Sequence, residues 1–135
     1  MSSIDLLKRQ HKEVGAIIQK LEEQIAAQDV TDKCFEISMN IAQLAGKLSM
    51  HLNSEDKYLY PSLMQHTNPE IKQVSLKFSS EMGNLLHAFT DYKNKYMVSQ
   101  NIKKNPMQFV NDSRNTINAI KKRVSSEEKE LYPLL

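Results

Sequence analysis

The chain has 135 residues, which is the size of one domain, and 18 basic and 16 acidic residues spread along its whole length give a net charge of only +2. Neither a basic stripe nor an acidic tail is present, so we expect no nucleic-acid partner. With only 3 glycines and 4 prolines, the composition favours helices joined by few turns.

The first predicted helix covers residues 4–25, where apolar side chains recur every three or four residues. This spacing places them on one helical face, and His11 lies in the middle of that face. The face consists of Ile4, Leu7, His11, Val14, Ile18, Leu21 and Ile25. A break over residues 28–32 separates this helix from the next.

The second predicted helix, residues 37–59, repeats the spacing and carries two polar groups on its inward face. That face consists of Ile37, Ile41, Leu44, Leu48, His51, Glu55 and Leu59. Because His51 and Glu55 are four residues apart, a single helix can present an imidazole nitrogen and a carboxylate oxygen to one ion.

The third and fourth predicted helices begin at Asn68-Pro69 and Asn105-Pro106, each a capping asparagine followed by proline. The third inward face has no ionisable ligand and consists of Ile71, Val74, Phe78, Met82, Leu85, Phe89, Tyr92 and Tyr96. The fourth consists of Phe109, Ser113, Ile117, Ile120, Val124, Glu127 and Leu131. We therefore predict an all-α fold, a single antiparallel up-down-up-down four-helix bundle spanning residues 1–135.

An internal repeat relates the two halves of the chain. At an offset of 72 residues, the second helix matches the fourth, with His51 on Arg123 and Glu55 on Glu127. At an offset of 71 residues, the first helix matches the third, with His11 on Met82. The bundle is thus predicted to be pseudo-twofold, with histidines in only one of its two equivalent half-sites.

Two segments carry a family resemblance. His51-Leu-Asn-Ser-Glu55-Asp-Lys-Tyr-Leu-Tyr-Pro61 and Arg123-Val-Ser-Ser-Glu127-Glu-Lys-Glu-Leu-Tyr-Pro133 resemble the paired motifs of hemerythrin-like, or HHE cation-binding, domains. The resemblance implies a non-haem di-iron centre with bridging carboxylates. Its ligands carry over to His11, His51, Glu55 and Glu127, whereas two histidine positions fall on Met82 and Arg123, which affects one iron only.

The candidate ligands are two imidazoles and two carboxylates, a set that suits iron(II), and also manganese(II) or zinc(II). Buried carboxylates require a compensating cation, which a metal or the Arg123 guanidinium could supply. We hypothesise that Arg123 replaces the charge of the second metal and leaves a site for one ion, with two ions as the alternative. A metal-free polar network, neutralised by Arg123 and protonated histidine, is the competing interpretation.

Several other residues receive a structural interpretation. His87 falls nearly opposite Phe78 on the third helix and is expected to face solvent, unless a π-bulge near Gly83 turns it inward. Met82 is expected to fill the core. Tyr60 and Tyr132, each followed by proline, are expected to end their helices.

The resemblance leaves three functions open. The favoured one is a binding protein that takes up dioxygen or nitric oxide, or holds iron, without turnover, because no nucleophile–base pair is recognisable. The others are a repair factor that donates iron, and a metal-free domain that binds protein partners. The lone Cys34, the absence of a signal-peptide core in residues 1–12 and the lack of a long apolar run indicate a cytoplasmic protein without a membrane partner.

Overall fold

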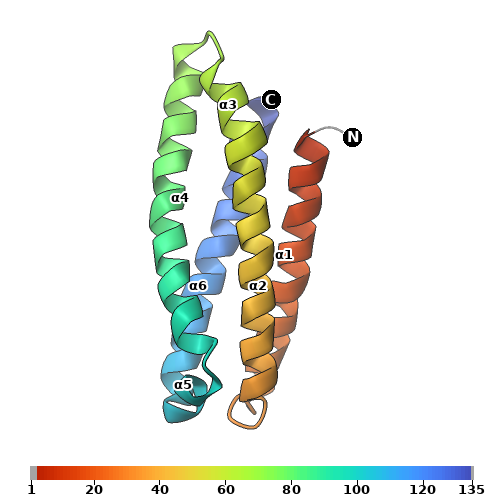
Figure 1. The fold of residues 1–135 in the computed structure, drawn as a ribbon, viewed down its shortest axis with the longest axis vertical. Helices are drawn as coiled ribbons and strands as arrows, with labels where there is room; N and C mark the ends of the chain where they lie inside the picture. The colour runs from red at the N-terminus through yellow and green to blue at the C-terminus, as the bar shows by residue number, and fades with distance from the viewer. Residues whose placement is uncertain (1–2, 135) are drawn as a thin grey trace.

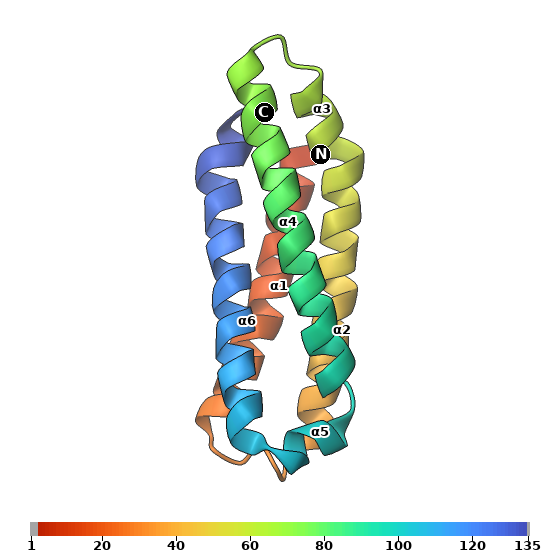
Figure 2. The same ribbon diagram turned by 90° about the vertical axis from the view of Figure 1, so that its left-hand side faces the viewer.

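Four long helices run alternately down and up around a common axis in the computed structural model, which describes residues 3–134 (Figure 1; Figure 2). The helices are α1 (Ser3–Ala26), α2 (Cys34–Ser54), α4 (Pro69–Tyr96) and α6 (Pro106–Ser126). No strand occurs in the described range. The predicted all-α antiparallel bundle is therefore confirmed.

Both predicted helix starts that combine asparagine and proline are present. The Asn68 side chain accepts a hydrogen bond from the backbone N–H of Glu70, and Asn105 accepts one from the N–H of Gln108. Between α4 and α6 the chain forms a short helix, α5 (Ser99–Lys104), that the sequence analysis did not predict. Its buried Ile102 fastens this connection to the core.

A π-helical turn interrupts each of the two repeated motifs. The turns cover Glu55–Leu59 and Glu127–Leu131, and in each the backbone N–H of the following tyrosine bonds to the carbonyl of the glutamate five residues earlier. The turns are 72 residues apart, the offset of the sequence repeat. The conformation of the backbone thus follows the internal symmetry of the sequence.

Proline gives the physical reason for these wide turns. A proline in a helix lacks the N–H that an α-helical turn needs and clashes with the carbonyl four residues before it. A turn with one more residue relieves that conflict. The expectation that Tyr60 ends its helix is wrong, because the chain continues through α3 (Tyr60–Met64), while Tyr132 passes into a 3₁₀ turn, Tyr132–Leu134.

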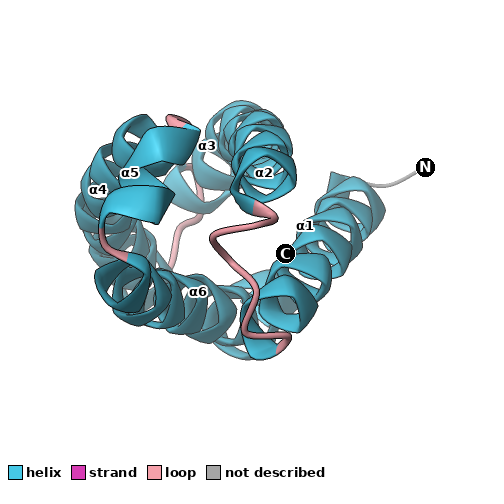
Figure 3. Cartoon of the chain, turned by 90° about the horizontal axis from the view of Figure 1, so that it is seen from below, coloured by secondary structure: helices cyan, strands magenta, loops and turns pink. Residues whose placement is uncertain are grey.

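The predicted inward faces form the interior of the bundle, which is seen end-on in Figure 3. Two apolar clusters fill it, one at each end of a polar layer. The smaller contains Leu7, Leu59, Leu63, Phe78, Leu131 and Tyr132. The larger includes Val14, Ile18, Ile41, Leu44, Phe89 and Ile120. His11, which follows Leu7 and precedes Val14 on α1, belongs to the layer between them.

No helix within residues 3–134 is both long enough and apolar enough to cross a membrane.

Candidate metal centre

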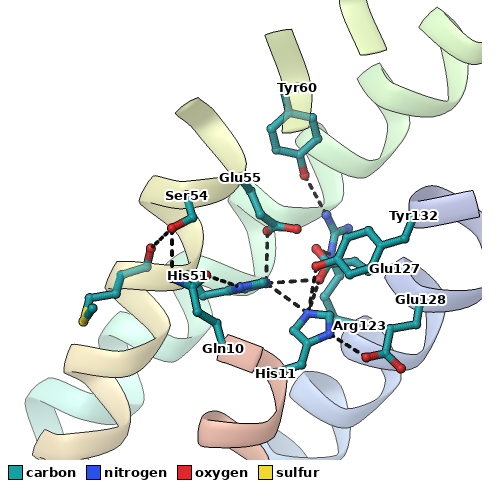
Figure 4. Close-up of polar contacts among 11 residues, drawn as sticks. Gln10, His11, His51, Ser54, Glu55, Tyr60, Arg123, Glu127, Glu128 and Tyr132 are labelled. Carbon is teal, nitrogen blue, oxygen red and sulfur yellow. Dashed lines mark hydrogen bonds and ion pairs between the residues drawn. The ribbon is translucent and has the colours of Figure 1, made fainter. Parts of the chain in front are cut away.

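Three side chains from three helices converge in the polar layer (Figure 4). Nε2 of His11 on α1 lies 3.0 Å from Nε2 of His51 on α2. Oε1 of Glu127, at the end of α6, lies 2.9 Å from the first nitrogen and 3.4 Å from the second. All three side chains are buried in the interior of the bundle.

Glu55, the fourth ligand predicted from the sequence, lies beside this cluster. Its Oε1 is 3.6 Å from Nε2 of His51, and the residue is 0% exposed. No hydrogen-bond donor among the described residues reaches either of its carboxyl oxygens. Burial, reinforced by the neighbouring Glu127, raises the pKa of Glu55 to about 10. An unpartnered carboxyl group in the interior is costly, and a bound cation would remove that cost.

A chain of hydrogen bonds fixes the orientation of His51. The Gln10 side chain donates through Nε2 to Ser54 Oγ at 2.9 Å, and Ser54 donates to the carbonyl of Met50. Gln10 therefore presents its Oε1 to Nδ1 of His51, 3.0 Å away. When the His51 ring is neutral, its proton therefore lies on Nδ1, which leaves the lone pair of Nε2 directed into the cluster.

His11 is oriented in the same way by a carboxylate. Its Nδ1 lies 3.0 Å from Oε1 of Glu128, and its ring stacks on that of Tyr132. Burial lowers the pKa of His11, but the hydrogen bonds to Glu127 and Glu128 raise it by more, so the net shift is upward. The neutral ring keeps its proton toward Glu128 and directs Nε2 at the cluster.

Arg123 occupies the half of the centre that lacks histidines. Its Nε donates to Oε2 of Glu127 at 3.1 Å, Nη2 donates to the Tyr60 hydroxyl at 2.9 Å, and the guanidinium lies 4.7 Å from the ring centroid of Phe78. Burial raises the pKa of Glu127, but hydrogen bonds with His11 and His51 when these rings are protonated on Nε2, the hydrogen bond with Glu55 and the charge of Arg123 lower it well below its usual range. Glu127 is therefore the ionised carboxylate of the centre.

The residues present fit a metal ion. Bonds of about 2.1 Å to nitrogen and oxygen, at right or tetrahedral angles, separate neighbouring ligand atoms by roughly 3.0–3.4 Å. The contacts among His11, His51 and Glu127 span 2.9–3.4 Å. Two neutral imidazoles and a carboxylate are also donors that suit a divalent transition metal.

A cavity of about 50 Å³ adjoins the centre between α2, α4 and α6. Its walls are mainly apolar, whereas His51, Arg123 and Glu127 border it on the side of the centre. Met82, which was expected to fill the core, is half-buried and lines this cavity instead. The apolar wall includes Leu48, Leu85, Phe89, Ile120 and Val124. This space is large enough for a molecule of a few atoms.

His87 stands outside the centre. Its side chain is 83% exposed and its Nε2 lies 3.8 Å from Asp91. Helix α4 continues without a π-bulge at Gly83, so nothing turns His87 inward. The expected surface position of His87 is therefore confirmed.

Sequence reasoning did not identify Gln10, Glu128 and Tyr132 as residues of the centre. Gln10 adjoins His11 in the sequence and Glu128 adjoins Glu127, so each lies at the margin of an inward face. In both motifs, four residues separate the glutamate from a Tyr-Pro pair. This spacing could have indicated the π-helical turns.

Comparison with known families agrees with this geometry. A family profile described as Hemerythrin HHE cation binding domain matches residues 2–135, essentially the whole chain. No individual curated protein and no solved structure matches significantly. This match agrees with the repeated motifs, the four-helix bundle and the buried His–Glu cluster. The chain belongs to the hemerythrin HHE cation-binding domain family.

Proposed function

We propose that this protein binds one non-haem iron ion through His11, His51 and Glu127, with Glu55 beside them as a further ligand, and that it binds a small molecule there or holds iron without turnover. The observation that carries the proposal is the buried convergence of His11, His51 and Glu127, whose ligand atoms all lie within 4.8 Å of one another. Manganese(II) and zinc(II) suit the same donors, so iron rests on the family as well as on chemistry.

A single ion is favoured by the contacts of Arg123. Its guanidinium bonds to Glu127 and Tyr60 and lies over Phe78, in the half where the repeat places the missing histidines. A fixed positive charge at this position would repel a second cation and already compensates one carboxylate. A second ion would thus lack the two histidines that Met82 and Arg123 replace, and the Arg123 guanidinium would occupy its position.

Dioxygen or nitric oxide is the proposed small ligand, and the support for it is the adjoining apolar cavity. Bound iron would supply a coordination position open to such a molecule. The protein would supply an apolar space for it beside His51 and Glu127. A cytoplasmic location is proposed as well, because the one cysteine, Cys34, is free and buried, as suits a reducing compartment.

The second candidate is a metal-free member of the family that binds protein partners. Its support is the same polar network, in which Arg123 and the two imidazoles already contact Glu127. The carboxyl of Glu55 argues against it, because no donor among the described residues reaches that buried group, and without a cation it depends on a proton shared with Glu127. A repair factor would use the same site, but with iron that leaves readily.

Elemental analysis of the purified protein, produced with iron supplementation, tests the proposal. We expect near one iron per chain in the wild type and in His87→Ala, a matched control that removes an exposed histidine, and loss of the metal in His51→Ala. Absence of any bound metal in the wild type would refute the site and favour the metal-free domain.

Stoichiometry is tested by Arg123→His combined with Met82→His, which restores the two missing histidines. We expect the bound metal to rise toward two ions per chain. Two ions per wild-type chain would show that Arg123 does not replace a metal.

A further inference from the structure

Tyr132 places a phenol oxygen beside a proposed metal ligand, His11. The residue is 1% exposed, and its hydroxyl lies 3.1 Å from Nε2 of His11. In Figure 4 the hydroxyl points toward the site where His11, His51 and Glu127 meet. The phenol ring is held by stacking on the His11 ring, with centroids 5.3 Å apart and planes 17° from parallel.

The π-helical turn accounts for this position. In a regular α-helix, residues five apart differ in direction by about 140°, so Tyr132 would point away from the face that carries Glu127. Here the backbone N–H of Tyr132 bonds to the carbonyl of Glu127, which draws residue 132 over residue 127. Both side chains consequently enter the same polar layer.

Tyr132 has only one hydrogen-bond partner among the described residues, and a metal would take that partner away. Within residues 3–134, the hydroxyl forms its hydrogen bond with Nε2 of His11 alone. Glu128 keeps the His11 proton on Nδ1, so Nε2 offers the lone pair that a metal would occupy. In the metal-loaded protein the phenol would thus be a buried polar group that has lost its partner, which is unfavourable.

The symmetry-related tyrosine has a different partner. Tyr60 follows the other π-helical turn, and its hydroxyl accepts a hydrogen bond from Nη2 of Arg123 at 2.9 Å. Tyr60 thereby belongs to the half with the arginine, and Tyr132 to the half with the histidines. The two tyrosines offer a matched pair for experiment.

We propose that Tyr132 is a direct phenolate ligand when the site holds iron(III), an inference that rests on the proposed iron site. The phenol O–H bond breaks, its proton leaves to solvent, and the phenolate oxygen forms the bond to the ion, with no electron transferred. Phenolate and carboxylate are hard anionic oxygen donors, so together with His11 and His51 they favour iron(III) over iron(II).

The test is to load the full chain with one equivalent of iron(III) as its nitrilotriacetate complex, remove excess, and record iron content, visible absorption and resonance Raman spectra. The wild type should show a phenolate-to-iron charge-transfer band with enhanced tyrosinate vibrations. Tyr132→Phe, which keeps the ring and removes one oxygen, should lose the band. Tyr60→Phe should keep it.

The outcomes separate the two proposals. Wild-type protein that holds one iron(III) through His51 but lacks the band would overturn the phenolate ligand and leave the metal site standing. Survival of the band in Tyr132→Phe would overturn it as well. Failure of the wild type to retain any iron would overturn the metal site, and the phenolate ligand with it.

Discussion

Glu55→Gln tests the central physical claim about this site, that the buried carboxyl of Glu55 destabilises the metal-free protein and that a bound cation removes this cost. In the metal-free protein the carboxyl of Glu55 is 0% exposed and is reached by no hydrogen-bond donor among the described residues. Burial, together with the hydrogen bond to Glu127 and the charge of that carboxylate, raises its pKa from 4.5 to about 10. At neutral pH the Glu55 carboxyl is therefore protonated in the folded protein and ionised in the unfolded chain. The variant has a neutral amide of similar size and needs no proton.

The magnitude follows from linkage. A group whose folded pKa is raised contributes its full stability below the unfolded pKa, and this contribution is lost as pH rises toward the folded value. For Glu55 the window runs from pH 4.5 to about 10. At pH 7 the loss has reached about 3 kcal/mol, from 1.36 kcal/mol for each pH unit above the unfolded pKa.

We expect metal-free Glu55→Gln to unfold at a higher temperature than the wild type at pH 7, by about 12 °C at roughly 4 °C per kcal/mol. The gap should widen from pH 5 to pH 9. Thermal unfolding followed by circular dichroism in the presence of a chelator measures it. Glu13→Gln, at a surface carboxylate whose pKa is lowered beside Lys47, is the control and should not reproduce the gain.

With iron bound the order should reverse, because the variant lacks the carboxylate that we propose as a further ligand. Parallel pH profiles for wild type and Glu55→Gln without metal would refute the reasoning, and so would a loss of stability in the metal-free variant. Either result would mean that Glu55 already has a partner in the folded protein.

The remaining predictions concern orientation, metal removal and packing. Glu128→Gln, which weakens the acceptor for His11 Nδ1, should reduce metal affinity about 10- to 100-fold with little effect on metal-free unfolding, as measured by competition with a chelator. Removing iron from the wild type should lower its unfolding free energy by about 2.7 kcal/mol if free iron had been at 100 times the Kd, a difference that calorimetry with and without chelator detects. Leu59→Ala, at a fully buried position in the smaller apolar cluster, should cost about 2–5 kcal/mol in urea unfolding, whereas Leu76→Ala, at a position 56% exposed, should cost far less.

The fold was predictable because its signals are local and repeated. Each long helix has an inward face with apolar residues at helical spacing, and Asn68 and Asn105 cap helices that begin with proline. The ligand positions follow from the same faces, since His11, His51, Glu55 and Glu127 interrupt otherwise apolar stripes. A polar group there must lie inside the bundle.

The residues that support the ligands were not predictable from periodicity. Gln10 is 8% exposed although it lies beside the stripe, and Glu128 reaches His11 from a side chain that is 43% exposed. Such marginal positions face inward or outward depending on how neighbouring helices are rotated. Tyr132 was missed for another reason, because a rule of 3.6 residues per turn fails across a π-helical turn.

The two halves of the bundle share one backbone plan and differ in the charge that each presents to the carboxylates. Both have a π-helical turn that brings a tyrosine next to the polar layer. In one half the tyrosine meets His11, which we propose as a metal ligand, and in the other it meets Arg123, which is a cation itself. His51 and Arg123 occupy equivalent positions in the sequence repeat. One half thus has a group that can bind a metal where the other has a permanent charge. A second ion could enter only by displacing a guanidinium held by Glu127, Tyr60 and Phe78, and this is why we propose a site for one metal.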